Sequence, residues 1–332
     1  MIKSEPSDFS EALYIYAVIP QSAAEGVRRI MPQELQLISQ QSFTAICRRA
    51  ADVQMASLNR QDLSRQLLAH QQTVEAIMPV TPILPVKFGS VAPDRASIER
   101  VLENGAPEFL RAFEQLAGKT QFEVLVMWNL EEVLADLSQS PEVTALKSSG
   151  LGAVELGVAV KDLIDARREA LAEQLSQALR GVSFDTISNV LMDDRMVLNL
   201  ATLIDKDRTG ELDTCLEMLD TVTGGALNFR CVGPLPPFSF ATVEVNFLDP
   251  SKVLWAHGVL GLAEGAISAE VRAAYHRLAK QMHPDTGATT QENDQMSELQ
   301  DAYKTLCAFT ESGGPVQVSV CRLELGVPGG AE

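Results

Sequence analysis

The chain has 332 residues, of which 46% are hydrophobic and 21% are charged, enough for two or three domains with hydrophobic cores. Its formal net charge of −17 argues against broad nucleic-acid binding, which needs clustered Lys and Arg, and against anionic membrane surfaces as partners. The five cysteines form no CxxC pair, so zinc ribbons, redox dithiols and a disulfide framework are poorly supported.

The first residues, MIKSEPSDFSEA, lack the basic and apolar regions of a signal peptide. No run approaches the ~18 apolar residues that a bilayer-spanning helix needs. We therefore expect a cytoplasmic protein.

Alternating strand and helix patterns predict a first α+β domain over residues 1–135. The β-branched and aromatic run at 12–20 is typical of a buried strand, and apolar residues at helical spacing follow later. The predicted strands are ALYIYAVIP (12–20), LQLIS, FTAICRR, ILPVKFGSV (83–91) and FEVLVMWNL (122–130), and the helices are QDLSRQLLAHQQTVEAIM and RASIERVLENGAPEFLRAFEQL.

A second α+β domain is predicted over residues 150–250, after the segment SSGLG. It begins with a long amphipathic helix over 155–180, and strand and helix patterns follow it as in the first domain. They are strands over FDTISNVL and RMVLNLATLI, a helix over TGELDTCLEMLDTVTGG, and two strands in ALNFRCVGPLPPFSFATVEV joined by a proline-rich bend. In the tail, residues 311–332, the alternating segment VQVSVCRLEL is suited to add a strand to an earlier sheet edge.

No catalytic pattern appears in the chain: there is no G-x-S-x-G, P-loop, G-x-G-x-x-G or HExxH. Adjacent carboxylate pairs point apart on a helix or strand, and the four histidines are scattered in sequence. For His70, a core or capping hydrogen bond is favoured over a ligand role. We expect no catalytic residue, no metal and no cofactor, and therefore no enzyme.

Four segments, LYIYAVI, ILPVKFGSV, LNLATLIDK and VGPLPPFSF, follow one another in an order that resembles the gas vesicle accessory family GvpL/GvpF. The last is the most specific, because it matches the family's Gly-Pro-x-Pro-Pro-aromatic-Ser-Phe bend. The resemblance spans roughly residues 12–245. It implies two mixed α/β units, no catalysis, and a role in building the gas vesicle shell with the small major shell protein and other accessory proteins.

Two interpretations of the proline-rich bend remain open. Its prolines fix the backbone and remove donors, so a rigid stretch with exposed aromatic rings would suit a shell-binding lip. The same residues would equally suit a rigid connector between strands that fills a core, and this connector is favoured. The residues concerned are Pro236, Pro237, Phe238 and Phe240.

A third unit, residues 252–310, is predicted to be all helical. On a helix through RAAYHRLAKQMHPDTG, residues 272–287, the apolar side chains fall on one face and a basic stripe falls on another. A second apolar face follows after about a dozen polar residues, which predicts an antiparallel helical hairpin. The basic stripe consists of Arg272, His276 and Lys280 with Arg277 beside it, and His283, Pro284 and Asp285 form the turn where Pro284 ends the helix.

The spacing of Leu260-Gly261-Leu262, Ala274-Tyr275, His283-Pro284-Asp285 and Ala302-Tyr303 resembles the J-domain of DnaJ-type co-chaperones. The resemblance implies that the turn and the basic helix engage a DnaK-type chaperone and stimulate its ATPase. An alternative is a J-domain fold kept only for packing or tethering.

The sequence thus predicts an α+β protein whose two GvpL/GvpF-type units precede a small all-α J-domain hairpin. Its predicted function is gas vesicle assembly: it binds shell protein and recruits a DnaK-type chaperone in the cytoplasm and at the gas vesicle. The alternative is a structural minor gas vesicle component whose J-domain is inert.

Overall fold

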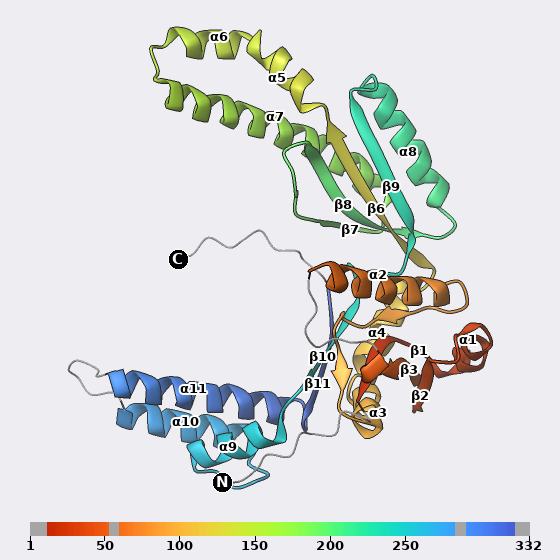
Figure 1. The fold of residues 1–332 in the computed structure, drawn as a ribbon, viewed down its shortest axis with the longest axis vertical. Coiled ribbons are helices and arrows are strands. Elements are labelled where there is room, and N and C mark those ends of the chain that lie inside the picture. Colours follow the sequence, from red (N-terminus) through yellow and green to blue (C-terminus); the bar gives the residue numbers. More distant parts are fainter. Residues whose placement is uncertain (1–11, 53–59, 283–289, 323–332) are drawn as a thin grey trace. The chain divides into compact units, whose positions relative to one another are not determined.

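The computed structural model describes residues 12–52, 60–282 and 290–322, and Figure 1 traces them. Two compact units make up the chain, and each is assembled from two separate stretches of sequence. The first comprises Met1–Glu114 and Thr242–Cys321, and the second comprises Gln115–Ala241 and Arg322–Glu332.

The first unit is built on a sheet whose strands follow the order β2-β3-β1-β4, with β5 also paired to β1. β1 is central, and its residues are buried from Leu13 to Ile19, as its β-branched and aromatic composition predicts. The elements up to the second unit are β1 (Leu13–Pro20), α1 (Ala24–Ile30), β2 (Gln36–Gln40), β3 (Phe43–Arg49), α2 (Arg60–Ile77), β4 (Leu84–Pro85), β5 (Val91–Ala92), α3 (Arg95–Asn104) and α4 (Ala106–Leu116).

The segment predicted as one strand at 83–91 is instead two very short strands, β4 and β5. A tight turn separates them: the Ser90 amide donates to the Lys87 carbonyl at 3.2 Å, and Gly89 has a φ of 90°. Glycine is favoured at that φ because it has no Cβ. Both short strands pair antiparallel with β1.

The C-terminal helices are inserted between two paired strands of the first unit. β10 (Thr242–Phe247) pairs antiparallel with β11 (Val316–Cys321), in register from Thr242↔Cys321 to Phe247↔Val316. β10 also meets the segment after β4, because the Lys87 amide donates to the Val243 carbonyl at 2.8 Å. The strand predicted in the tail is therefore present, and it returns the chain to the first unit.

Between these strands lie α9 (Pro250–Leu260), α10 (Ser268–Met282) and α11 (Thr290–Glu311). Their apolar faces meet in one core, and the rings of Tyr275 and Tyr303 stack with centroids 4.3 Å apart. The buried residues of this core are Val253, Ala256, Leu260, Val271, Ala274, Leu299, Ala302 and Leu306. The predicted α+β class with a C-terminal helical hairpin is confirmed.

The second unit is a four-stranded antiparallel sheet in the order β7-β8-β6-β9. The helices α7 and α8 pack on it, and their apolar side chains share a core with Val124, Val126 and Leu200. The elements are β6 (Lys119–Trp128), α5 (Leu130–Ser138), α6 (Pro141–Ser148), α7 (Ala153–Val182), β7 (Asp185–Ser188), β8 (Met196–Asp205), α8 (Thr209–Val222) and β9 (Leu227–Leu235).

The boundaries expected near residues 135 and 150 do not coincide with these units. β6 was placed in the first domain by its position in the sequence, but it pairs with β8 and β9 of the second unit. Strand partners are chosen by packing across long sequence separations, which a strand's own composition does not reveal. Among the helices described, none is long and apolar enough to cross a membrane.

Replacing Phe240 with Ala should destabilise the second unit by about 3 kcal/mol. The Phe240 ring is 8% exposed and packs against Ile187, Ala201 and Leu203, so its loss leaves a cavity. Denaturant unfolding of the two proteins measures the difference. Val222→Ala is the control, because Val222 is 78% exposed and should change the free energy of unfolding by no more than about 0.5 kcal/mol. Equal effects of the two substitutions would contradict this packing.

Candidate functional site

The basic stripe predicted on α10 lies at the surface of the helical hairpin. The opposite face of α10, with Val271 and Ala274, is buried in the hairpin core. The helix start is fixed by the Glu270 carboxylate, which accepts a hydrogen bond from the Ile267 amide at 2.9 Å. The structure therefore brings the four predicted basic side chains together on exposed positions: Arg272, His276, Arg277 and Lys280.

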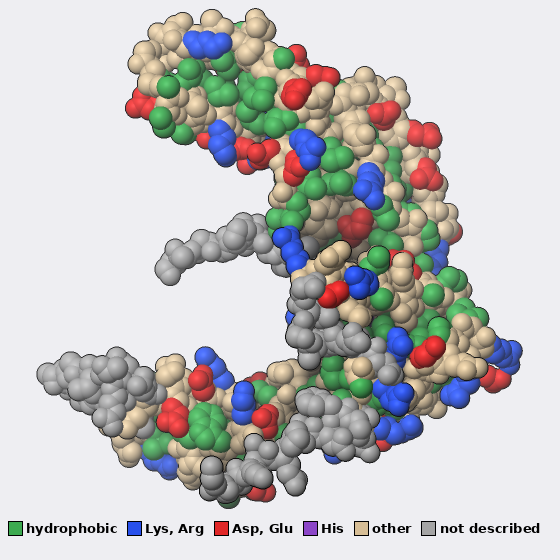
Figure 2. Space-filling model, in the orientation of Figure 1, with side chains coloured by type: hydrophobic (Ala, Val, Ile, Leu, Met, Phe, Trp, Pro, Cys, Tyr) green, Lys and Arg blue, Asp and Glu red, His purple; other side chains and the backbone are tan. Residues whose placement is uncertain are grey.

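None of the three Arg and Lys residues of this stripe forms an ion pair within the described ranges. Their charges are available to an outside partner, and guanidinium and ammonium groups favour an acidic surface. Figure 2 shows blue and red side chains intermixed over α10 and α11, so the positive charge is local rather than part of a broad basic surface.

His283, Pro284 and Asp285 lie outside the described residues, between the end of α10 at Met282 and the start of α11 at Thr290.

The proline-rich bend after β9 is packed more tightly than a binding lip requires. Pro236 and Phe240 are buried, while Pro237 and Phe238 are half-buried. The bend is closed by the Phe238 amide donating to the Pro236 carbonyl at 2.7 Å, and by the Phe240 amide donating to the Pro237 carbonyl at 3.1 Å. This burial favours the connector, although one side of the bend still reaches solvent.

A polar network holds this bend to the sheet. The Ser239 amide donates to Gln121 Oε1 at 2.9 Å, and the Ser239 hydroxyl donates to Glu123 Oε1 at 3.3 Å. Asn189 donates to the other carboxylate oxygen of Glu123 at 3.0 Å and lies 3.5 Å from Asn199 Oδ1. Burial raises the pKa of Glu123, although these donors act against that rise. The two motif segments that hold Asn199 and Ser239 are thus linked through Asn189 and the Glu123 carboxylate.

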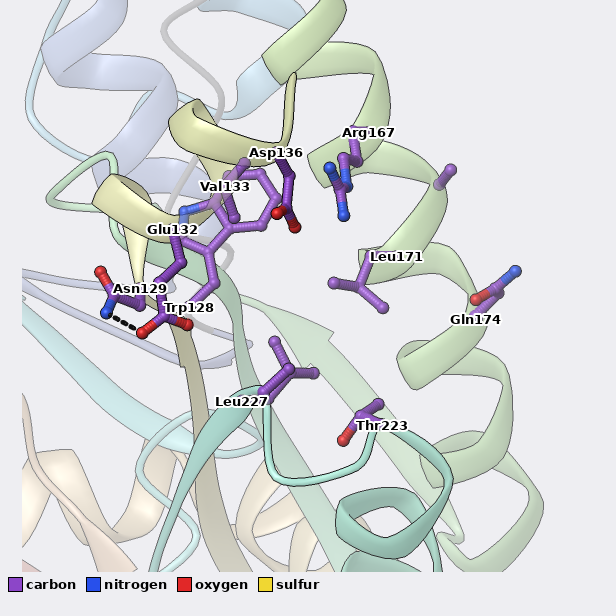
Figure 3. Close-up of a pocket in the computed structure, with 12 residues that line it drawn as sticks. Trp128, Asn129, Glu132, Val133, Asp136, Arg167, Leu171, Gln174, Thr223 and Leu227 are labelled. Carbon is purple, nitrogen blue, oxygen red and sulfur yellow. Dashed lines mark hydrogen bonds between the residues drawn. The ribbon is translucent and has the colours of Figure 1, made fainter. Parts of the chain in front are cut away.

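Sequence reasoning missed this network and also missed a cavity of about 410 Å³ in the second unit, drawn in Figure 3. The Trp128 ring forms part of its wall, and the indole Nε1 donates to the Asp194 carbonyl at 2.9 Å. Asn129 and Glu132 also line it, and Asn129 donates to Glu132 at 2.7 Å (Figure 3). Within the described residues no group of three or more His, Cys, Asp or Glu side chains is placed to hold a metal ion.

A buried aromatic cluster surrounds His70 in the first unit. The Tyr14 hydroxyl lies 2.8 Å from His70 Nδ1, the Tyr16 ring stacks on the imidazole at 5.4 Å, and the Phe88 ring meets it edge-on. The core hydrogen bond favoured for His70 is therefore present. Burial lowers the pKa of His70 to about 4, and burial also raises the pKa of Tyr14.

Each of the two parts of the chain matches a known protein family. Residues 12–242 match the family described as gas vesicle synthesis protein GvpL/GvpF, and residues 256–311 match the DnaJ domain. Gas vesicle protein F of Dolichospermum flosaquae is 24% identical over 243 residues, which are 70% of this chain and 98% of that protein. DnaJ homolog 1, mitochondrial, of Saccharomyces cerevisiae is 34% identical over 91 residues, which are 26% of this chain and 17% of that protein.

Two solved structures share the fold of the larger part. The crystal structure of gas vesicle protein GvpF from Anabaena sp. PCC7120 has a TM-score of 0.56 at 19% identity, covering 69% of this chain and 95% of that chain. GvpF from Microcystis aeruginosa has a TM-score of 0.54 at 20% identity, covering 69% and 98%.

Lowering the pH from 7 to 5 should reduce the free energy of unfolding by about 2 kcal/mol through His70 alone. The folded state holds His70 neutral, whereas the unfolded chain takes up a proton below its ordinary pKa of 6.5. This stability is fully present above pH 6.5 and is lost as the pH falls toward 4. Denaturant unfolding at both pH values measures the loss.

The matched variant is His70→Gln, which keeps a hydrogen-bonding side chain but does not titrate. Its loss of stability between pH 7 and pH 5 should be smaller than that of the wild type by the same amount. An identical pH dependence in the two proteins would show that His70 does not control it.

Proposed function

This chain belongs to the GvpL/GvpF family of gas vesicle synthesis proteins and carries a DnaJ domain, and from that premise we propose that it links shell assembly to a chaperone. In this role the GvpL/GvpF part binds the major shell protein, and the DnaJ domain recruits a DnaK-type ATPase chaperone. A small apolar shell protein exposes aggregation-prone surface before assembly. Bringing the chaperone to the same molecule would limit that aggregation.

The observation that carries the proposal is the insertion of the DnaJ domain between β10 and β11. Six residue pairs join the two strands, from Thr242↔Cys321 to Phe247↔Val316. Asn104 of α3 adds a hydrogen bond to the Val316 carbonyl at 3.2 Å. A domain attached at both ends supports a shared task with its host better than a domain on a free linker does.

The proposed chaperone contact combines the exposed stripe of α10 with the turn that follows it. Arg272, His276, Arg277 and Lys280 reach solvent on one helix, which supports a charge-complementary docking face. The turn residues His283, Pro284 and Asp285 are assigned to the contact by the DnaJ resemblance.

The proposed shell contact uses the solvent-facing side of the proline-rich bend. Pro237 and Phe238 are half-buried and can touch a partner, while the buried Pro236 and Phe240 would hold them in place. The polar network through Ser239 and Glu123 gives this bend a rigid base. Rigid aromatic and proline side chains bind at low entropic cost.

We propose no catalytic activity for the chain itself, in line with a family of gas vesicle synthesis proteins. The second candidate function is a structural minor component of the gas vesicle in which the DnaJ domain is inert. The extra pairing of β10 with β11 would serve this function too, because it secures the domain whether or not a chaperone binds.

Excising the DnaJ domain should leave shell-protein binding intact. The excision replaces residues 248–315 by Asn-Gly, so that Phe247 and Val316, which already pair, are joined by a two-residue hairpin turn. Pull-down of the major shell protein by the excised and full-length proteins measures the effect. A simple truncation after residue 250 serves as the comparison, because it also removes β11 and should lower the thermal midpoint. Loss of shell binding in the excised protein, with its fold intact by circular dichroism, would overturn the division of tasks.

Replacing His283 with Gln should abolish stimulation of the partner chaperone's ATPase, and Asp285→Asn should act similarly by weakening a charge-assisted hydrogen bond. Arg272→Glu and Lys280→Glu should slow association several-fold, and more so at low salt, because exposed charges steer encounter. Single-turnover ATPase assays with a DnaK-type chaperone measure both effects.

Lys304→Glu is the matched control, since it makes the same charge reversal at an exposed position of α11 rather than α10. It should slow association much less than Lys280→Glu. If the wild type stimulates no DnaK-type chaperone of its own cell, the inert-domain function is favoured. Equal stimulation by the wild type and by His283→Gln would remove the turn from the contact.

A further inference from the structure

A groove of about 760 Å³ opens on the first unit, where α2, β3 and the segment after α1 meet. Its walls are mainly apolar, and its volume is in the range of small-molecule sites. The apolar lining residues are Ile30, Met31, Pro32, Leu35, Ala69, Ala76, Ile77 and Val80. Ile30 and Val80 are 50% and 44% exposed, so the apolar surface continues to the rim.

Arg48 also lines this groove, and among the described residues it forms no ion pair with an acidic side chain. The Arg48 Nε is buried, and no hydrogen-bond acceptor lies within reach of it among the described residues. Arg48 hydrogen-bonds the Tyr16 hydroxyl, which is neutral, and burial raises the pKa of that hydroxyl. Leaving a buried charged donor unmatched is costly, so such a group calls for an explanation.

The surroundings hold the Tyr16 ring in a fixed position, and Arg48 beside it is half-buried. Tyr16 is 5% exposed, and its ring stacks on His70 with an interplanar angle of 23°. Arg48 lies on β3, where it is one residue from the fully buried Cys47. A guanidinium beside a fixed hydroxyl can offer two donors to a carboxylate.

We propose that this groove binds a small apolar carboxylate, of the fatty-acid type, whose head group pairs with Arg48 and Tyr16. The hydrocarbon chain then lies along the apolar wall formed by α2 and the segment after α1. This site is separate from both contacts proposed above, because it uses neither the bend nor α10.

A hydrocarbon chain fits the groove better than a peptide does. A peptide would bring amide groups that need partners, and apart from Arg48 and Tyr16 the lining offers only Gln72, Thr73 and Glu34 as polar side chains. Glu34 is exposed and would repel a second negative charge near the rim. The charge pattern thus favours a single carboxylate at the Arg48 end.

The test is titration calorimetry of the full-length protein with dodecanoate, below the concentration at which it forms micelles. Dodecanol and dodecyltrimethylammonium have the same chain without the negative head group. We expect dodecanoate to bind with one-to-one stoichiometry and the other two to bind at least tenfold more weakly. Equal binding of all three probes would show that Arg48 contributes no recognition, and absence of dodecanoate binding would overturn the site.

Two variants address the site independently. Arg48→Gln removes the charge but keeps a polar side chain, and it should weaken dodecanoate binding at least tenfold. Ala76→Phe leaves Arg48 in place and fills the groove from α2, so it should also abolish binding while its thermal midpoint stays close to that of the wild type. Arg29→Gln is the control, because Arg29 is an exposed cation of α1 paired with Glu25 and does not line the groove.

A short apolar peptide with a free C-terminal carboxylate completes the set of probes. If the peptide binds in an Arg48-dependent manner and dodecanoate does not, the groove is a peptide site and the proposal is wrong. Retained dodecanoate binding in both Arg48→Gln and Ala76→Phe would place the fatty acid elsewhere and overturn it as well.

Discussion

The antiparallel pairing of β10 with β11 is the interaction on which the architecture of the C-terminal half depends. It closes the chain around the helices α9 to α11 and returns it to the first unit, where Asn104 and the Lys87 segment meet the ribbon. Pairing between two strands separated by a whole domain requires that the domain's ends lie close together. The hairpin core of α9, α10 and α11 provides that closeness, so packing in the helices and pairing in the ribbon support each other.

Much of this fold can be predicted from the sequence, because local pattern determines the elements. The buried run at β1, the long helix α7 and the apolar faces of α10 and α11 follow from periodicity and composition. The division into two units does not follow from local pattern, because β6 pairs with β8 and β9, which lie more than sixty residues away. The split of the 83–91 segment depends on a turn at Gly89, which the prolines and glycine permit but do not specify.

The candidate sites divide in the same way. The basic stripe of α10 can be predicted from the sequence, because helical spacing alone puts its side chains on one face. Two other features cannot be predicted in this way, because each depends on residues from distant segments. They are the hydrogen-bond network of Glu123, Ser239 and Asn199, and the Arg48 Nε that has no hydrogen-bond partner among the described residues. An isolated Glu or Arg in a strand carries no local sign of its partners. A sequence motif can include such a residue, but only the fold shows which distant residues it contacts.

Insertion of a domain into a hairpin has a consequence for folding cooperativity. Before the helices form, pairing β10 with β11 must close a loop of residues 248–315, and the length-dependent entropy of that closure is roughly 4 kcal/mol. Folded helices remove most of this cost by holding the ends together. Loosening the helical core should therefore release β11 from the first unit, so that the two melt as one thermodynamic unit. Proteolytic cleavage within the helices would then reveal loss of the β10–β11 pairing, although the protease cuts neither strand.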